Sequence, residues 1–273
     1  MTQGDKVNGS PTREADPSPR TLRAPWTAAA AAFNFGGGVR YHLTAWRYRR
    51  TLWAPYSREA AAFLAEWRPS ADRLVIVGAS AGWHLDATFL ARFERVTCID
   101  PDPVAAWLFG RRFPQVPLTW CVDDYLTPEG PLPWRDNLAR LFADHPDAAV
   151  LWSGILGQCI GLWPRAVAVE DADGTLREAD TFRRWKDALA GHLGGRPWAS
   201  LHDRVSAAVA PAFVRQDLDR TPTTDALVHM AWPDGTPWGD HLTHGLAQGR
   251  PVRLLTWQRR PGMWHVMEAV AVP

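Results

Sequence analysis

The feature that most constrains this chain is a short apolar run that ends in a cluster of small residues. Residues 73–77 read Arg-Leu-Val-Ile-Val, and residues 78–82 read Gly-Ala-Ser-Ala-Gly. A continuous β-branched run of this length is typical of a strand buried on both faces. Small residues directly after it allow the backbone to turn sharply. The sequence therefore predicts a central strand over 73–77 and a tight turn over 78–82.

Strand and helix patterns then alternate along the chain. Strands are predicted at 95–99, 118–122, 148–152 and 198–201, and helices at 103–113, 137–142 and 181–193, with a further helix pattern through Leu85, Phe89, Leu90 and Phe93. Parallel strands joined by helical crossovers produce this rhythm. The predicted fold class is therefore α/β, with a doubly wound, mostly parallel Rossmann-like sheet.

The C-terminal third carries additional elements. Two strand patterns, at 252–258 and 263–272, flank Arg260-Pro261-Gly262 and predict an antiparallel hairpin. The stretch 226–232 fits either a strand or a helix. Residues 241–246 are predicted to be helical.

Helices also precede the predicted core. One helix is predicted over 41–52, and a second over 57–67 with Ser57 as its N-cap. Residues 1–23 are polar and rich in proline, so they are predicted to form a disordered tail. The rest, 24–273, is predicted to be a single domain, with 24–70 as a helical lid and 71–273 as the Rossmann-like core.

Composition and charge limit which partners the protein can bind and in which compartment it is expected. The 273 residues carry a formal net charge of +1, which is not the strongly basic balance of a nucleic-acid-binding protein. No apolar run approaches the ~18 residues that span a membrane, and residues 1–23 lack the apolar part of a secretory signal. The separated cysteines Cys98, Cys121 and Cys159 fit reduced thiols. We therefore expect a cytoplasmic protein.

Small and acidic residues follow four of the predicted strands. Asp100 ends the second strand, Asp123 and Asp124 follow the third, and residues 153–158, Ser-Gly-Ile-Leu-Gly-Gln, follow the fourth. Open parallel sheets bind ligands beside the carboxyl ends of their strands. An acid placed like Asp100 lies beside the turn after the first strand and can accept both hydroxyls of a ribose.

This arrangement resembles the class I S-adenosylmethionine-dependent methyltransferases over roughly residues 57–273. The segments that carry the resemblance are 74–82, 99–103, 122–126 and 147–158. It implies S-adenosylmethionine as the cofactor and methyl transfer to an unidentified acceptor. The near-neutral charge and the many aromatic residues favour a small molecule as that acceptor.

The resemblance also implies roles for individual residues. The methionine end of the cofactor falls to Gly78, Ser80 and Gly82, the ribose to Asp100, the adenine amino group to Asp124 with Asp123 one position out of register, and the region of the methyl group to Ser153 and Gly154. Candidates for contact with the acceptor are Gln158, Tyr41 of the lid, and His202. The family usually has glycine where this chain has Ser80 and an acid where it has Ile76. No residue is predicted to be catalytic.

Two other functions use the same segments. Gly78-x-Ser80-x-Gly82 matches the nucleophile elbow of the α/β-hydrolases, and Asp203 and His265 follow in the order of that triad. Against this, that fold needs strands before the elbow, and none is predicted there. A non-catalytic binding or scaffold protein is the other alternative, because the departures at Ser80 and Ile76 fit a chain that has lost the cofactor.

Histidines offer weaker signals. His202-Asp203 follows a predicted strand and could hold a general base, although a surface pair is the simpler interpretation. His241 and His244 share one face of the predicted helix at 241–246. A metal needs further ligands, and no third accompanies them in the sequence, so no metal site is predicted.

Overall fold

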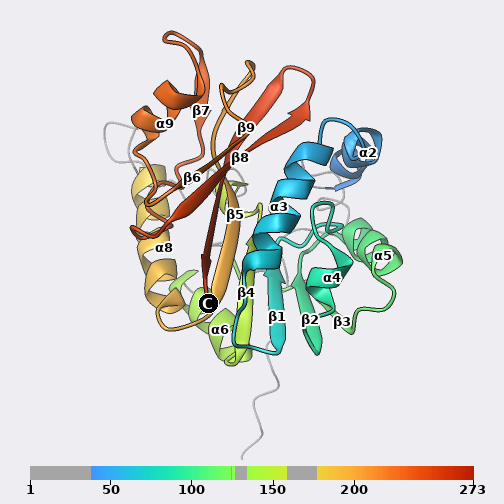
Figure 1. The fold of residues 1–273 in the computed structure, drawn as a ribbon. Coiled ribbons are helices and arrows are strands. Elements are labelled where there is room, and N and C mark those ends of the chain that lie inside the picture. Colours follow the sequence, from blue (N-terminus) through green and yellow to red (C-terminus); the bar gives the residue numbers. More distant parts are fainter. Residues whose placement is uncertain (1–37, 124, 127–133, 159–176) are drawn as a thin grey trace, which may run out of the picture.

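The computed structural model describes residues 38–123, 125–126, 134–158 and 177–273 (Figure 1). The predicted tail 1–23, Asp124 and Cys159 lie outside these residues. The strands are β1 (Arg73–Val77), β2 (Arg95–Ile99), β3 (Leu118–Cys121), β4 (Ala148–Ser153), β5 (Trp198–Ala207), β6 (Arg215–Leu218), β7 (Trp238–Asp240), β8 (Val252–Arg260) and β9 (Met263–Val272). They form one sheet in the order β3-β2-β1-β4-β5-β9-β8-β6, with β7 pairing to β5.

The first five strands pair in parallel, as predicted. Val77 at the end of β1 lies between Ile99 of β2 and Trp152 of β4. The residues that follow these strands, Gly78 and Asp100 among them, therefore emerge at one edge of the sheet. This register is what brings the candidate ligand-binding loops together.

Helices cover both faces of the parallel strands. The helices are α2 (Gly38–Tyr48), α3 (Ala54–Glu66), α4 (Ala87–Leu90), α5 (Pro103–Arg112), α6 (Trp134–Asp144), α8 (Arg177–Leu193) and α9 (Thr224–Ala231), and η1 (Leu156–Gln158) is a 3₁₀ turn. Leu74, Ile76 and other inward residues of one face pack with α3, α4 and α5. Val75 and Val77 face the other core, which includes residues of α6 and α8. The sheet is thus doubly wound, and the predicted fold class is confirmed.

The C-terminal part extends the sheet with antiparallel strands. β9 pairs antiparallel with both β5 and β8, which confirms the predicted hairpin. β5 is longer than predicted: Leu201 lies opposite the last residue of β4, Ser153, and the strand continues to Ala207. The second half of β5 therefore extends beyond the carboxyl ends of its parallel neighbours. The end of β8 and the start of β9 extend beside it (Figure 1).

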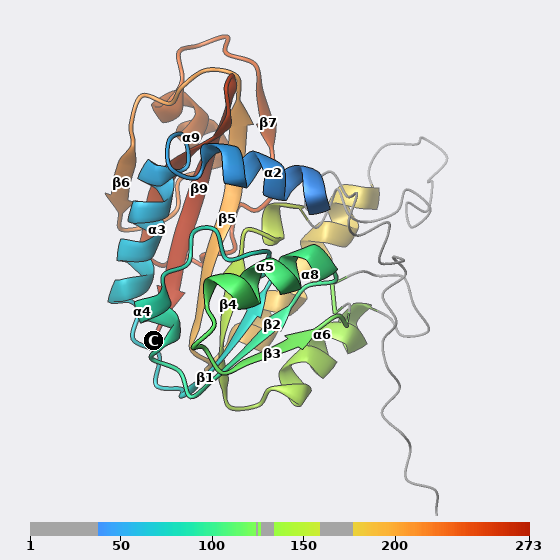
Figure 2. The same cartoon turned by 90° about the vertical axis from the view of Figure 1, so that its right-hand side faces the viewer.

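Helix α2 lies across the part of the sheet where β5, β8 and β9 extend beyond the parallel strands. In Figure 2 it passes above α5 and beside the upper parts of β5 and β9. Its buried residues include His42 and Ala45. The predicted helical segment before the core therefore sits over the carboxyl ends of the parallel strands.

Several local predictions were wrong. Residues 241–246 form no helix: Leu242 and Gly245 both have positive φ angles, of 55° and 91°, which an α-helix cannot accommodate. The second helix begins at Ala54, so Ser57 is not its cap. The segment 226–232, left open between strand and helix, lies mostly in α9.

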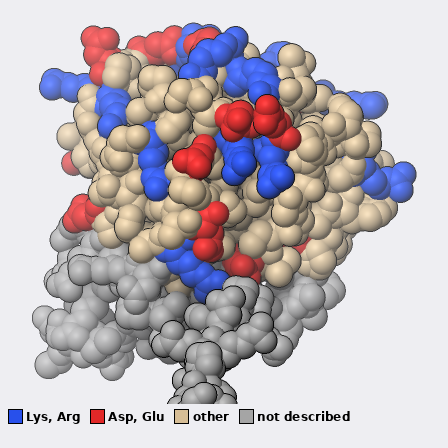
Figure 3. Space-filling model, turned by 90° about the horizontal axis from the view of Figure 1, so that it is seen from below, with Lys and Arg blue, Asp and Glu red and all other residues tan. Residues whose placement is uncertain are grey.

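The surface agrees with the near-neutral composition. Figure 3 views the molecule from below, at the ends of the parallel strands opposite the candidate site, and acidic and basic groups are interspersed on the described part of that face. Among the described residues, no helix combines the length and apolarity needed to cross a bilayer. Cys98 and Cys121 are free thiols.

Candidate functional site

The turn after β1 is held against the tip of β2. Ser80 has a positive φ of 47°, between Gly78 at 73° and Gly82 at 61°. This conformation aims the Ser80 N–H at the Asp100 carboxylate, with 2.8 Å between the nitrogen and Oδ2. The predicted proximity of the turn and Asp100 is therefore present as a direct hydrogen bond.

Asp100 is embedded in backbone donors. Its Oδ1 accepts the Asp102 N–H at 2.9 Å, while Oδ2 accepts that of Ser80. Burial raises the pKa of Asp100 to about 6, against the lowering effect of those two N–H groups. The carboxyl thus changes charge near neutral pH, unlike an ordinary aspartate.

Packing explains part of the small-residue pattern. A Cβ placed on Gly78 would lie 2.6 Å from the Cβ of Ile155, and one on Gly82 would lie 2.8 Å from the Phe113 ring. Glycine is therefore needed at both positions by neighbouring side chains, independently of any ligand. The helix expected directly after the turn is also absent: α4 begins only at Ala87, capped by Asp86, and has four residues.

α2 is fastened to the start of α5 by a buried histidine. His42 Nε2 lies 3.0 Å from Asp102 Oδ2, and the Trp83 indole N–H donates to His42 Nδ1 at 3.2 Å. Because an indole nitrogen can only donate, Nδ1 must accept and Nε2 must carry the imidazole proton. The contact to Asp102 is therefore a hydrogen bond from a neutral histidine.

Tyr41 lies between the turn after β1 and strand β5. The Ser80 side chain and the charges of both Asp100 and Asp203 act on its hydroxyl. Burial is the main cause that raises the pKa of Tyr41 to about 12, so it stays protonated. The predicted acceptor residue thus lies between the small-residue turn and β5.

The loop after β4 faces the same edge. Ser153 Oγ lies 3.0 Å from His84 Nε2, and the Gln158 amide donates to the Gly154 carbonyl at 3.0 Å. Burial, then the charge of Arg112, lowers the pKa of His84 to about 4, so this imidazole is neutral. Ser153 and Gly154 are therefore at the predicted place, while Gln158 bonds within its own loop.

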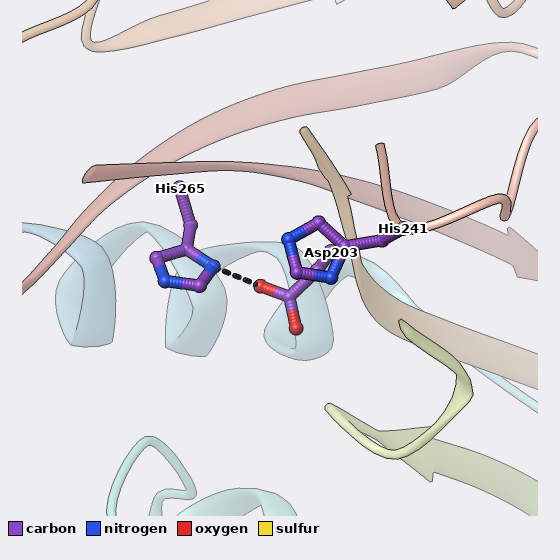
Figure 4. A group of neighbouring side chains, drawn as sticks. All are labelled: Asp203, His241 and His265. Atoms are coloured by element: carbon purple, nitrogen blue, oxygen red, sulfur yellow. Dashed lines mark hydrogen bonds and ion pairs between the residues drawn. The ribbon is translucent and has the colours of Figure 1, made fainter. Parts of the chain in front are cut away.

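Asp203, His241 and His265 form a compact group beyond that loop (Figure 4). Asp203 Oδ1 accepts a hydrogen bond from His265 Nδ1 at 2.8 Å. One ligand atom from each residue lies within 4.8 Å of the others, a set that could hold a metal ion. His241 therefore does not group with His244, the neighbour considered in the sequence, but with Asp203 and His265 from the distant strands β5 and β9.

His202 lies on the opposite face of β5 from Asp203. Its Nδ1 is 2.9 Å from Ser200 Oγ, its Nε2 is 3.6 Å from Glu268 Oε1, and it is fully buried. Neither residue belongs to a surface pair, contrary to the simpler interpretation. Nothing in this geometry supports contact between His202 and an acceptor.

The loop after β3 contributes fewer described residues to the candidate site. Asp123 follows β3 and is half-buried, and Asp124 is not among the described residues. His42, His84 and His241 are the site residues that sequence reasoning did not assign. No local motif signals them, since each meets its partner across at least 35 positions of chain.

Comparisons with known proteins find similar solved structures only at low sequence identity. No protein-family model and no curated protein matches the chain. Similar solved structures include the N-methyltransferase NodS of Bradyrhizobium japonicum WM9 with S-adenosyl-L-homocysteine (13% identity, 80% of this chain and 86% of that chain, TM-score 0.38). Others are magnesium protoporphyrin IX methyltransferase of Synechocystis PCC 6803 with S-adenosylmethionine (10%, 92% and 100%, 0.41) and the glycopeptide N-methyltransferase MtfA (15%, 78% and 93%, 0.35). With TM-scores below 0.5, function has to be argued from the site itself.

Proposed function

We propose that this chain binds S-adenosylmethionine at the carboxyl edge of its parallel strands and transfers the methyl group to a small-molecule acceptor. The observation that carries the proposal is the 2.8 Å hydrogen bond between Ser80 N and Asp100 Oδ2. It joins the acid at the tip of β2 to the small-residue turn after β1. In doubly wound sheets an acid at this position binds the ribose of a nucleotide.

The atoms around Asp100 fit a ribose. Each carboxylate oxygen accepts one backbone N–H, from Ser80 or from Asp102. An ionised carboxylate has about four lone-pair sites, so two neighbouring hydroxyls can donate without displacing either N–H. Following the resemblance, we assign the methionine end of the cofactor to the turn 78–82 and the adenine amino group to Asp124 or Asp123.

The acceptor side is enclosed by buried side chains. Tyr56 of α3, Asp203 and His265 are each no more than 4% exposed, and Tyr41 of α2 reaches Ser80. An enclosed site suits a small molecule better than a polymer lying on the surface. Bound S-adenosylmethionine supplies an electrophilic methyl group, and α2 and α3, acting as the lid, align the acceptor and exclude water.

The hydrolase alternative has one observation in its favour. Asp203 and His265 are hydrogen-bonded at 2.8 Å, as a triad requires. However, the described contacts of Ser80 are to Asp100 and Tyr41, and in the described part of the chain no strand precedes β1. A fluorophosphonate probe that fails to label Ser80 would end this alternative.

Ligand binding is the experiment that tests the proposal against the scaffold alternative. S-adenosylmethionine and S-adenosyl-L-homocysteine should raise the melting temperature of the full-length chain and bind in calorimetry. Asp100→Ala should abolish both effects while the variant stays folded by circular dichroism. A matched control is Asp234→Ala, an aspartate whose side chain is 86% exposed. Absence of any shift at saturating ligand would support the scaffold alternative.

A further inference from the structure

Several buried side-chain atoms in the described part of the chain have no hydrogen-bond partner, and Nε2 of His265 is one of them. His265 is 3% exposed, and its Nε2 has no hydrogen-bond partner among the described residues. Buried polar atoms in folded proteins are nearly always paired, and each exception calls for an explanation. In Figure 4 this nitrogen points away from both Asp203 and His241. It is therefore available to a group that the chain does not provide.

The hydrogen bonding of His265 sets its chemical state. Burial alone would raise the pKa of Asp203, but its interactions with His265, including the hydrogen bond, and the nearby His241 and Arg259 hold it well below its usual range. An ionised carboxylate only accepts, so His265 Nδ1 must carry the proton that lies between them. In the neutral imidazole the lone pair is then on Nε2, as a base requires.

A metal ion is the competing explanation of this group. His241 Nδ1 lies 3.3 Å from the Gly157 carbonyl, and its Nε2 lies 3.1 Å from Ser206 Oγ. Both nitrogens of His241 are thus already paired, and His265 Nδ1 is protonated against Asp203. A metal bound through His265 Nδ1 would have to replace one of the His241 bonds and the bond between His265 and Asp203, and it would leave His265 Nε2 unexplained. A base explains the free atom with every observed bond in place.

The surroundings connect His265 to the proposed methyl-transfer site. A Cβ on Gly157 would lie 2.8 Å from that of Asp203, so the loop after β4 packs directly on the pair. The Trp257 ring of β8 lies 5.5 Å from His265 and 5.3 Å from Tyr56 of α3, centroid to centroid. Both Ser80 and the charge of Asp203 act on the Tyr41 hydroxyl.

The charged and titratable groups on these elements favour an oxygen acceptor. Arg259 of β8 lies over the rings of Tyr41 and Trp257, at 5.7 Å and 6.0 Å from their centroids. Its charge acts on Asp203 and Tyr41. A fixed cation opposes a second cation such as an ammonium and stabilises a developing oxyanion. Burial keeps Tyr41 and Tyr56 protonated, and their hydroxyls can donate to that oxyanion.

We propose that His265, positioned by Asp203, is the general base that takes the proton from a hydroxyl acceptor, a step that rests on the proposed methyl transfer. The acceptor O–H bond breaks and its proton passes to Nε2. The oxygen forms the bond to the methyl carbon, and the carbon–sulfur bond breaks with its electron pair staying on sulfur. The proton on His265 is then lost to water. The lone pair on His265 Nε2, which has no partner among the described residues, is thus the one that takes the proton.

The first test reads the imidazole directly and needs no turnover. Nitrogen-15 spectra of the histidine rings, recorded on the full-length chain with S-adenosyl-L-homocysteine at neutral pH, should show His265 protonated at Nδ1 and bare at Nε2. Asp203→Asn should mix the two tautomers. A proton on Nε2 in the wild type overturns the proposal. Stoichiometric uptake of Zn²⁺ with loss of the Nδ1 proton overturns it in favour of a metal site.

The second test uses phenol and tyramine as acceptor probes with S-adenosylmethionine. The wild type should methylate the phenolic oxygen, and His265→Gln should lower kcat by about 100-fold or more, with cofactor affinity in calorimetry unchanged. Asp203→Asn should lower kcat with little change in KM. His229→Gln is the matched control, because that side chain is 76% exposed.

The outcomes separate the two proposals. Failure of the wild type to bind cofactor removes the proposed function, while the tautomer of His265 still reports on the base. Bound cofactor with no methylated phenol, transfer to the tyramine nitrogen alone, or an unchanged kcat in His265→Gln overturns the assignment of His265 and leaves methyl transfer standing.

Discussion

His42 Nε2 lies 3.0 Å from Asp102 Oδ2, and this buried contact joins the first described helix to the tip of the second strand. The same oxygen accepts the Gly38 N–H at 3.1 Å, and Asp102 Oδ1 accepts the Val104 N–H that begins α5. One carboxylate thus caps α5 and anchors α2 over the candidate site. The position of α2 therefore depends on the charge of Asp102.

Asp102→Asn should destabilise the fold by about 2 kcal/mol at neutral pH, because the asparagine amide would face the His42 and Gly38 donors. Burial tends to raise the pKa of Asp102, but the bond from His42 and the N–H donors lower it overall. A lowered pKa gives stability that is present above the unfolded value and lost as the pH falls through the folded one. The difference from wild type in urea unfolding should therefore shrink below about pH 4.

A matched control for that prediction is Asp86→Asn. Asp86 also caps a helix, through the Thr88 N–H, but it is exposed and holds no second element. Asparagine is nearly as good a cap as aspartate, so little change is expected. Equal losses in the two variants, or a loss in Asp102→Asn that does not depend on pH, would contradict the anchoring role.

Asp100 should make cofactor affinity depend on pH. Its pKa is raised to about 6, mainly by burial, so in the free protein this group favours folding at low pH and opposes it as the pH rises from about 4 to 6. Ribose hydroxyls prefer the charged carboxylate, so binding should weaken by roughly 10-fold or more below pH 6 and should release protons there. Calorimetry in buffers of different ionisation enthalpy measures that release, and Asp100→Asn should show none.

Gly78→Ala should cost about 3 kcal/mol or more. An alanine in this left-handed conformation costs roughly 1–2 kcal/mol. Its Cβ would also lie only 2.6 Å from the Cβ of Ile155. Gly195→Ala isolates the first effect, since φ there is 77° and nothing lies within 4 Å. In a double-mutant cycle, Ile155→Gly should recover at least about 1 kcal/mol of the Gly78→Ala loss. Additive losses would show that the two residues do not clash.

The buried Arg204–Glu268 pair should contribute to acid sensitivity. The two side chains lie 2.6 Å apart, fully buried. Burial tends to raise the pKa of Glu268, but the neighbouring His202, 3.6 Å away, and the charge of Arg204 lower it to about 2. Its stabilisation should therefore disappear as the pH falls from about 4.5 to 2. Glu268→Gln should cost about 3–5 kcal/mol in urea unfolding.

Glu66→Gln provides the comparison for the buried pair. Glu66 pairs with Arg253 at 2.9 Å, but its side chain is 62% exposed. An exposed pair contributes about 0–1 kcal/mol. Similar losses in the two variants would mean that burial does not set the strength of the Glu268 pair.

The parallel sheet was predictable because its signals are local. The apolar run 73–77, the later strands and the turn at 260–262 each specify an element from adjacent residues, and the parallel order follows from their alternation with helices. Asp100 could be placed beside the turn 78–82 for the same reason, since the ends of parallel strands meet at one edge. The helix expected at 241–246 is absent because Leu242 and Gly245 have positive φ angles, which the sequence pattern did not indicate.

The acceptor side was predicted only in part, because the sequence named Asp203 and His265 together only as partners in the hydrolase alternative. His265 and Asp203 are separated by 62 positions, and His202 and Asp203 are neighbours that face opposite sides of one strand. A single-residue change of register would exchange their roles. Likewise His42 and Asp102 meet only because α2 lies over the sheet edge.

The sequence by itself determined the five parallel strands, the C-terminal hairpin and the meeting of Asp100 with the small-residue turn, because periodicity and turn chemistry act over a few neighbouring residues. It did not predict β6, β7 or the second half of β5. Only the tertiary structure decided which histidines are buried, which nitrogen of each carries the proton, and that Nε2 of His265 has no partner among the described residues. Those properties depend on the solvation and hydrogen bonding of side chains that are brought together from distant segments.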